Sequence, residues 1–390
     1  MMPVRVLFTT RPAHGHVQPL LPLAGALTKA GHEVGFATGP SFLPELRARG
    51  FVCFEAGAEL LPWEQQITLF PEWPTLLPQE QRLFSFTRIF AGVEALPRAV
   101  DVLDVINSWH PAVLINEVAE LGGPLAAARS QLPHVTVGYG PPVQAEVLAA
   151  TDSVLRAHWA SWGMEPATPC GLYDLLYLDP CPPSLQPTDS VVIPNRHGIR
   201  PGLGPPAGEA SAAVMRRLPS EAVLYLTMGT VFGRDAALFR EVITGLAEIG
   251  RPAVVTLGPH VTPSEIGRTW PNVFVLPFLA QSAILPRCDL VVTHGGAGSM
   301  LGALALGVPL LLLPRGADHF YNADRVVAAG AGRQVEPAAV SAETVAREAR
   351  LLLSNPGYRV AARRIQAEIE SMPSPAEVAE LIADLAKSRG

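Results

Sequence analysis

The stretch from Val291 to Ser299 constrains the fold of this chain more than any other. It is an apolar run that ends in a histidine and a glycine-rich turn, and a helical pattern follows from Met300 to Leu306. A buried strand that leads through glycines into a helix is typical of α/β proteins. Unpaired N–H groups in the first helical turn and the helix dipole favour a bound anion. The stretch is therefore either a phosphate site or a tight turn that binds nothing.

The same alternation of apolar runs and helical patterns extends along the whole chain. It predicts parallel strands joined by right-handed crossovers. The predicted strands are 4–10, 33–38, 51–54, 112–115 and 134–137 in the first half, and 222–228, 253–257, 273–276, 290–293 and 310–313 in the second. We therefore predict an α/β protein of two Rossmann-like, doubly wound domains that face each other across a cleft.

The length of 390 residues exceeds what one ordinary core contains, which also predicts two domains. A segment rich in proline and glycine, at about 194–208, is the predicted linker. The predicted domains cover residues 1–200 and 209–374, and a C-terminal helix at 375–390 is expected to pack back on the first domain.

Charge and composition exclude several kinds of partner. A formal net charge of −6 gives no general attraction to nucleic acid or to an anionic membrane. The most apolar segment, 301–314, is interrupted by Gly302, Gly307 and Pro309, and it is too short to span a bilayer. The four cysteines are far apart, which argues against disulfides and a zinc site. With no signal-peptide pattern visible, we expect a cytoplasmic protein without membrane insertion.

Two regions, Leu60–Leu96 and Pro141–Tyr177, carry many aromatic residues without a clean helical or strand period. They include Trp63, Trp73 and Phe90 in the first region and Trp159 in the second. Large aromatics commonly fill a core, and they also line apolar clefts built on loops above a sheet. The sequence leaves both interpretations open.

The loop Thr9–His16 follows the first predicted strand, at the carboxyl edge of the sheet where α/β proteins bind ligands. A histidine there can act as a general base if a carboxylate orients it. His14 is the candidate base, and Glu117 and Glu120 are the candidate orienting acids because they follow the strand 113–115. The other interpretation is that His14 is an ordinary polar surface residue.

Four blocks of sequence, taken together, resemble the GT-B-fold glycosyltransferases of family 1. The resemblance is strongest to the bacterial enzymes that glycosylate macrolides, polyketides and other natural products. The blocks occur in the same order at plausible spacing and span nearly the whole chain: Phe8–Leu20 with Gly31–Val34, Met228–Thr230, Phe278–Gln281 continuing through Leu285–Asp289 to His294–Ser299, and Gly316–Ala323.

The resemblance implies a role for each matching residue. His14 matches the base that takes the proton of the acceptor hydroxyl, and Glu117 is the candidate to orient it. In the donor half, the resemblance assigns contacts to the diphosphate, the nucleotide base and the sugar hydroxyls in turn. These residues are Thr230, His294, Gly296, Ala297, Gly298 and Ser299 for the diphosphate, Phe278, Leu279 and Gln281 for the base, and Asp318 and His319 for the sugar.

Two departures from the family pattern bear on the donor. Plant relatives carry a glutamate eight residues after the glycine-rich histidine, where it binds the ribose hydroxyls, and this chain has Gly302 there. The loss of that carboxylate favours a thymidine diphosphate (TDP) sugar over a uridine diphosphate (UDP) sugar. His319 stands where glutamine is commoner, which leaves the sugar open.

The resemblance predicts an inverting, metal-independent transferase that moves a hexose or deoxyhexose to an apolar aromatic or polyketide acceptor. No cofactor beyond the nucleotide sugar and no metal is expected, because helix amides bind the diphosphate and the chain has no Asp-x-Asp pair. Two alternatives are an epimerase or hydrolase of nucleotide sugars and an inactive auxiliary ligand-binding protein. A homodimer is compatible with the sequence, which does not specify the oligomeric state.

Overall fold

The chain folds into two compact units that are not simple halves of the sequence. The structure is a computed structural model that describes residues 3–59, 65, 68–77, 80–187, 192–204, 208–230 and 233–388. The first unit consists of Met1–Cys181, Pro187–Arg200 and Met372–Gly390, and the second of Pro182–Gln186 and Pro201–Ser371. The main crossing between the units, after Arg200, lies inside the predicted linker. Of the sequence features named above, Trp63 and the linker residues 205–207 lie outside the described residues.

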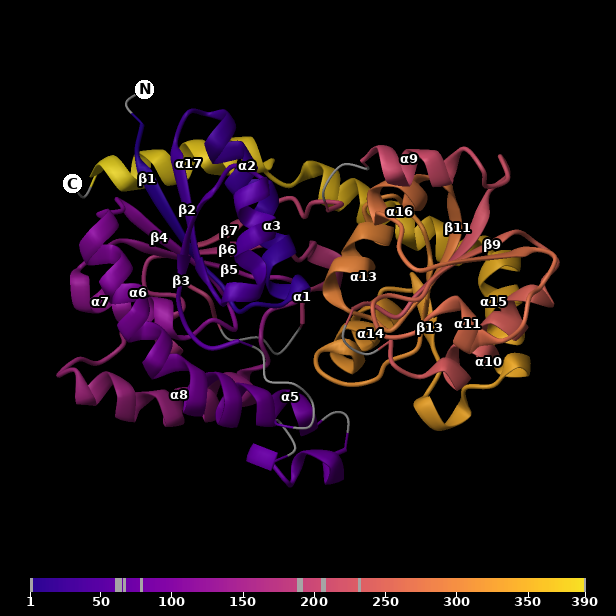
Figure 1. Cartoon of the computed structure of the whole chain (residues 1–390), viewed down its shortest axis with the longest axis horizontal. Helices are drawn as coiled ribbons and strands as arrows, with labels where there is room; N and C mark the ends of the chain where they lie inside the picture. Colours follow the sequence, from indigo (N-terminus) through magenta and orange to yellow (C-terminus); the bar gives the residue numbers. More distant parts are fainter. Residues whose placement is uncertain are drawn as a thin grey trace. The chain divides into compact units, whose positions relative to one another are not determined.

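A parallel sheet forms the centre of the first unit (Figure 1). Its described strands number seven, in the order β3-β2-β1-β4-β5-β6-β7. The register pairs Val6 of β1 with Val34 of β2 on one side and with Val113 of β4 on the other. The strands are β1 (Arg5–Thr9), β2 (Glu33–Thr38), β3 (Val52–Glu55), β4 (Val113–Glu117), β5 (His134–Val137), β6 (Leu176–Asp179) and β7 (Arg196–Gly198).

Helices cover both faces of this sheet, so its strands are apolar on both sides. Val6 and Phe8 pack in one apolar layer and Leu7 in the other, as the period of two in a strand requires. The helical segments of this unit are α1 (His14–Val17), α2 (Leu21–Lys29), α3 (Leu43–Ala48), α5 (Glu80–Phe84), the π-helical η4 (Ser85–Glu94), α6 (Ala95–Trp109), α7 (Gly122–Ser130), α8 (Ala145–Ser161) and α17 (Pro375–Ser388).

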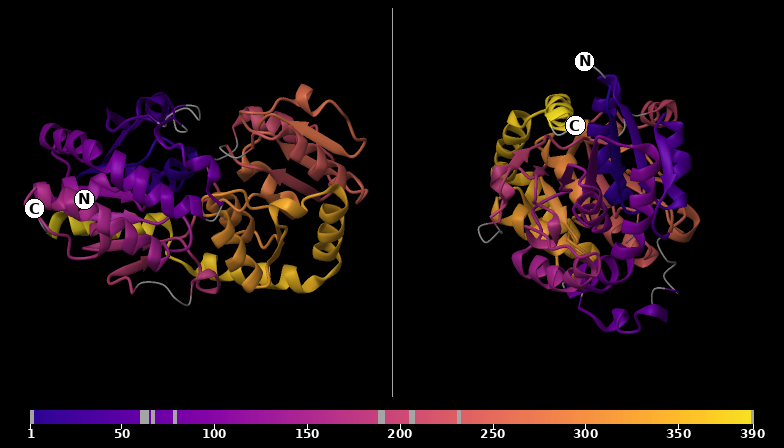
Figure 2. Two further views of the ribbon diagram at one scale, coloured as in Figure 1. Left: turned by 90° about the horizontal axis from the view of Figure 1, so that it is seen from below. Right: turned by 90° about the vertical axis from the view of Figure 1, so that its left-hand side faces the viewer.

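The C-terminal helix α17 belongs to the first unit although the rest of the second unit precedes it in the chain. It contacts α2, and both figures of the whole chain show it as a yellow ribbon among the indigo and magenta elements (Figures 1 and 2). Val378 and Ile382 of α17 share one buried layer with Leu23 and Leu27 of α2. Burial of this apolar face holds the end of the chain on the first unit.

The second unit repeats the plan with a parallel sheet of six described strands, in the order β10-β9-β8-β11-β12-β13. Leu224 and Leu226 of β8 pack with Leu290 and Val292 of β11 under helices α10 and α15. The strands are β8 (Val223–Thr227), β9 (Ala253–Thr256), β10 (Val273–Leu276), β11 (Cys288–Thr293), β12 (Leu310–Leu312) and β13 (Gly332–Gln334). The helices are α9 (Glu209–Met215), α10 (Ala236–Ala247), α11 (Pro263–Ile266), α12 (Gln281–Ile284), α13 (Ala297–Leu304), α14 (His319–Ala328), α15 (Ala342–Ser354) and α16 (Pro356–Ser371).

The predicted two-domain α/β class is confirmed, and the ten predicted strands correspond to described strands. Three strands and several helical segments were not predicted, among them the 15-residue helix α6. The strands β6, β7 and β13 are only three or four residues long. The helix α8 and the segment η4 lie within the aromatic regions that showed no clean period. No helix of the described residues is long and apolar enough to cross a membrane.

Candidate functional site

Two neighbouring parallel strands of the first unit bring a histidine and a carboxylate together. β1 ends at Thr9 and β4 ends at Glu117, and Thr9 pairs with Asn116 in the register. The chain turns after β1 into α1, which carries His16. Nδ1 of His16 lies 2.9 Å from Oε1 of Glu117. The carboxyl edge of the sheet therefore holds a His–Glu pair, although His14 was the residue predicted to form it.

The prediction that Glu117 orients His14 is wrong. The side chain of His14 is exposed, and its ring meets the ring of Phe42 edge-on at 4.9 Å between centroids. The two histidines lie two residues apart on a helical turn, so their side chains project about 200° apart. Only His16 points toward β4.

Glu117 is buried and remains ionised. Its Oε2 accepts a hydrogen bond of 2.7 Å from the backbone N–H of Ala119, and its Oε1 lies on His16. Burial opposes ionisation, but the contacts with His16 and the N–H of Ala119, together with the positive charge of nearby Arg11, outweigh it and hold the pKa of Glu117 below its ordinary value. An ionised carboxylate on Nδ1 fixes the orientation of the imidazole ring.

Glu120, the other candidate acid, has a different role. Its carboxylate lies 2.5 Å from the hydroxyl of Thr9 and accepts hydrogen bonds from the backbone N–H groups of Gly122 and Gly123 at the start of α7. Burial raises the pKa of Glu120. This side chain ties the end of β1 to the first turn of α7 and does not contact either histidine.

The glycine-rich turn of the second unit lies at the carboxyl end of β11, which β8 and β12 flank. Gly296 is the N-cap of α13, and no side chain caps this helix. A Cβ on Gly296 would lie 2.6 Å from Nε2 of His294, and one on Gly229 would lie 2.7 Å from the same ring. The glycines are required because the imidazole of His294 packs directly against the backbone at both positions.

His294 and His319 form a buried pair whose rings meet edge-to-face at 4.4 Å between centroids. Burial lowers the pKa of each to about 3. Both rings are therefore neutral near pH 7 and offer hydrogen bonds rather than positive charge. A contact of His294 with a diphosphate, as the resemblance implies, would therefore be a hydrogen bond from a neutral ring.

Asn322 joins the predicted diphosphate and sugar residues, and sequence reasoning missed it. Its Nδ2 donates to Oδ2 of Asp318 at 2.7 Å and to the carbonyl of Gly295 at 2.9 Å. It lies one helical turn after Asp318, which is the N-cap of α14. That spacing places both side chains on one face of the helix, which was the available signal in the sequence.

The other predicted donor residues differ in accessibility. Phe278 is 71% exposed, whereas Leu279 is buried and packs inside the unit. Gln281 donates a hydrogen bond of 2.8 Å to the hydroxyl of Ser299 in the first turn of α13. Thr230 is half-buried beside Gly229 at the end of β8, and Ala297 and Gly298 complete the first turn of α13. Leu279 thus contributes packing rather than an open ligand contact.

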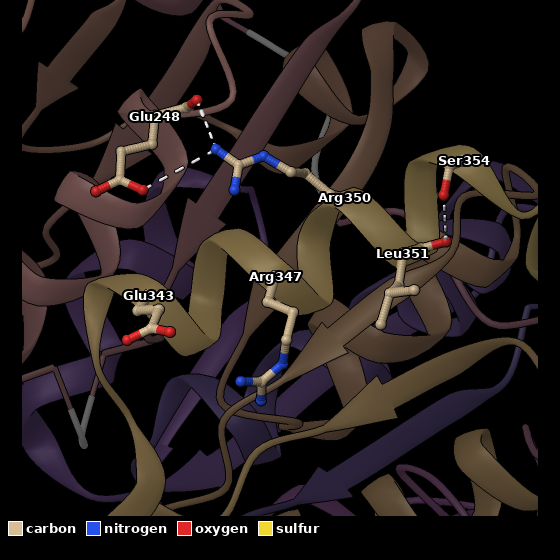
Figure 3. Close-up of a pocket in the computed structure, with 6 residues that line it drawn as sticks. All are labelled: Glu248, Glu343, Arg347, Arg350, Leu351 and Ser354. Carbon is tan, nitrogen blue, oxygen red and sulfur yellow. Dashed lines mark hydrogen bonds and ion pairs between the residues drawn. The ribbon is translucent and has the colours of Figure 1, made fainter.

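A hollow of about 400 Å³ on the second unit lies apart from these loops (Figure 3). It is lined by residues of α15 and by Glu248, the C-cap of α10, which lies next to the start of β9 at the opposite, amino edge of the sheet. Arg350 reaches across it toward Glu248. Its lining is Glu248, Glu343, Arg347, Arg350, Leu351 and Ser354, none of which is a predicted site residue.

Comparison with known proteins identifies the family. Residues 240–385 match the family model described as "Erythromycin biosynthesis protein CIII-like, C-terminal domain". L-demethylnoviosyl transferase of Streptomyces niveus is 33% identical over 392 residues, which cover 97% of this chain and 98% of that protein. The chain belongs to the family 1 glycosyltransferases of the GT-B fold. It is a glycosyltransferase, and the resemblance noted in the four blocks is confirmed.

Further relatives of this glycosyltransferase agree in length and fold. Tylactone mycaminosyltransferase of Streptomyces fradiae is 28% identical and covers 96% of this chain and 90% of its own length. The crystal structure of the glycosyltransferase SnogD from Streptomyces nogalater has a TM-score of 0.75 at 27% identity, covering 99% of this chain and 100% of that one. The structure of SsfS6 from Streptomyces sp. SF2575, complexed with thymidine diphosphate, has a TM-score of 0.77 at 26% identity, covering 98% and 99%.

The neutral histidine pair predicts an acid-sensitive glycosyltransferase. Each folded ring takes up a proton only near pH 3, whereas the unfolded ring takes one up near pH 6.5, so falling pH favours unfolding from about 6.5 downward. At pH 5 each buried ring costs about 2 kcal/mol of unfolding free energy relative to pH 7. We expect His319→Gln to remove about that much of the pH dependence in urea titrations at the two pH values. An unchanged pH dependence in the variant would contradict the neutral pair.

Proposed function

We propose that this glycosyltransferase moves a hexose or deoxyhexose from a TDP-sugar to a hydroxyl group of an apolar natural product, with inversion and without a metal ion. The observation that carries the proposal is the partly buried hydrogen bond between His16 and Glu117 at the carboxyl edge of the first sheet. A histidine oriented by an ionised carboxylate is suited to take a proton from a hydroxyl nucleophile.

His16, and not His14, is the proposed base. Its Nδ1 contacts Glu117, so Nε2 is the nitrogen that accepts the acceptor proton. As the O–H bond breaks, the new bond from oxygen to the anomeric carbon forms and the bond from that carbon to the diphosphate breaks. The imidazolium that results is stabilised by Glu117. Attack from the face opposite the diphosphate inverts the anomeric centre.

The second unit supplies the proposed donor site. Backbone N–H groups of the first turn of α13, the hydroxyl groups of Ser299 and Thr230, and the neutral ring of His294 can donate hydrogen bonds to a diphosphate. Asp318 and His319 are the proposed contacts to the sugar hydroxyls, and the exposed ring of Phe278 is the proposed contact to the nucleotide base. Donation by helix amides and the dipole of α13 supports departure of the diphosphate without a metal.

A TDP-sugar is the proposed donor because of the surroundings of Gly302. A Cβ on Gly302 would lie 3.2 Å from Cδ1 of Leu285, and Oε1 of Gln281 is 3.9 Å away. Neutral side chains therefore surround the position where a glutamate would bind a 2′-hydroxyl. The thymidine diphosphate bound to the relative SsfS6 supports the same choice.

An apolar acceptor is proposed from the aromatic rings around His16. The rings of Tyr139 and Phe90 lie edge-on to His16, with centroids at 5.5 and 6.3 Å. Two relatives are named for the sugar that they transfer and the natural product that receives it. They are tylactone mycaminosyltransferase and 10-deoxymethynolide desosaminyltransferase of Streptomyces venezuelae. Rings beside the base suit an acceptor that is itself flat and apolar.

Substitution of the two histidines separates the proposed base from its neighbour. We expect His16→Ala to lower kcat for transfer by about 10²- to 10⁴-fold, since general-base catalysis is lost. His14→Ala, which removes an exposed ring on the same short helix, should stay within a few-fold of the wild type. The measurement is product formation by mass spectrometry, with TDP-hexoses and a panel of flat phenols and polyketides. Full activity of His16→Ala would refute the assignment, and turnover of the donor without an acceptor would favour a hydrolase or epimerase.

Calorimetric titration tests the proposed nucleotide preference. We expect the wild type to bind TDP more tightly than UDP. Gly302→Glu should narrow or reverse the difference, because the added carboxylate can accept from the 2′-hydroxyl of UDP. The control is Val327→Ala, which changes an exposed residue of α14 and should leave both affinities unchanged. Tighter binding of UDP by the wild type would overturn the proposed preference.

A further inference from the structure

Arg11 lies between His16 and a second glutamate on the first unit. Nη1 of Arg11 is 3.2 Å from Nε2 of His16. Its Nε and Nη2 donate to the two carboxylate oxygens of Glu94 at 2.6 and 2.9 Å. The side chains thus form a continuous row, Glu117–His16–Arg11–Glu94, in which the imidazole lies between an acceptor and a donor.

The row determines where the imidazole proton lies. A guanidinium group can only donate hydrogen bonds, so Nε2 of His16 must present its lone pair to Arg11. In its neutral form the ring therefore carries its single proton on Nδ1, where it is donated to Glu117. This is the tautomer that a base acting through Nε2 requires.

Arg11 is anchored by groups other than His16. It is 6% exposed, and its guanidinium carbon lies 3.8 Å from the centre of the Phe90 ring. Burial alone would lower the pKa of Arg11, but the charge and hydrogen bonds of Glu94 outweigh burial and raise it, so the group remains a cation. Glu94 ends the π-helical segment η4, and such segments often occur at functional sites.

Glu94 also provides Arg11 with a carboxylate partner of its own. A buried guanidinium needs a carboxylate partner. The two-point contact with Glu94 satisfies Arg11, and Glu117 therefore remains available to His16. When His16 takes up the acceptor proton, the row contains two cations, the imidazolium and Arg11. Each is then paired with its own carboxylate, Glu117 and Glu94 respectively.

We propose that Arg11, held by Glu94, is a positioning residue that keeps His16 in the Nδ1–H tautomer with the lone pair of Nε2 available. The inference rests on the proposed role of His16 as the base. The acceptor hydroxyl takes the place of Arg11 at Nε2, and its proton moves to Nε2 as the oxygen attacks the anomeric carbon and the nucleoside diphosphate leaves. Arg11 remains paired with Glu94 during the step.

The test replaces the ion pair as a unit. Arg11→Met alone would leave Glu94 buried without a partner, so the main variant is the double substitution Arg11→Met/Glu94→Met, which exchanges the pair for apolar side chains of similar length. The matched control is Arg5→Met/Glu33→Met, which removes an exposed Arg–Glu pair at the other end of β1 and near the start of β2. Thermal unfolding establishes that each variant is folded, and calorimetric titration establishes that each variant still binds TDP.

Two readouts report on the proton and on the reaction. Nitrogen NMR of protein labelled with ¹⁵N-histidine, with the His16 signals assigned through His16→Asn, shows which ring nitrogen carries the proton. We expect Nδ1–H in the wild type and the control, and a mixture of the two neutral tautomers in the double variant. Its kcat should fall about 10- to 100-fold, with the KM for the TDP-sugar unchanged, since only the orientation of the base is lost. Arg11→Lys, which keeps a donor, should restore part of kcat.

The outcomes separate this inference from the proposed function. A wild type that transfers sugar, combined with a double variant that keeps both the tautomer and kcat, overturns the role of Arg11 and leaves the function intact. A wild type with the Nδ1–H tautomer that transfers sugar to none of the acceptors refutes the proposed function, while the NMR comparison still decides the role of Arg11. A fall in kcat with an unchanged tautomer also contradicts the inference.

Discussion

The hydrogen bond between His16 and Glu117 is the interaction on which the proposed chemistry depends. It exists because β1 and β4 are adjacent and parallel, so the residues that follow them meet at one edge of the sheet. Glu117 is buried, and a buried carboxylate is tolerated only when its oxygens are satisfied. His16 and the N–H of Ala119 provide those partners. The strand order therefore produces both the position of the base and the ionised group that orients it.

The candidate donor site of the second unit also lies at the carboxyl edge of a parallel sheet, but there burial determines the charge state of the histidines. His294 and His319 are buried and neutral, so a diphosphate at this turn would meet hydrogen-bond donors and the dipole of α13 rather than cationic histidines. The cost of this arrangement is steric. Gly229 and Gly296 have no side chains because the His294 ring occupies the space that a Cβ would need.

Much of the fold could be predicted from local pattern, and the exceptions have physical causes. Apolar runs that lead into glycines, such as Leu290–Thr293 before Gly295, indicate buried strands of a parallel sheet whatever their partners. The strand β7 gave no such signal, because Arg196 and His197 are polar and the strand lies at the sheet edge. The segment η4 carries aromatics on a π-helical register that does not match the period of 3.6 residues.

The proposed site could be predicted only to the level of the loop. The sequence indicates a histidine after β1 and an acid after β4, but His14 and His16 differ in the direction in which α1 projects them. The contacts of Arg11 with Glu94 and of Asn322 with Gly295 join residues 83 and 27 positions apart. Such long-range pairs follow from packing and not from spacing along the chain.

The most direct test measures two properties of the Glu117→Gln variant, its rate of sugar transfer and its affinity for TDP. Glutamine fits the same space but can present an N–H to His16 and so disturb the tautomer. We predict that kcat falls at least about 10²-fold while TDP binding, which we assign to the second unit, is unchanged. A Glu117→Gln protein that transfers sugar at the wild-type rate would contradict the claim that the His16–Glu117 pair is the catalytic base.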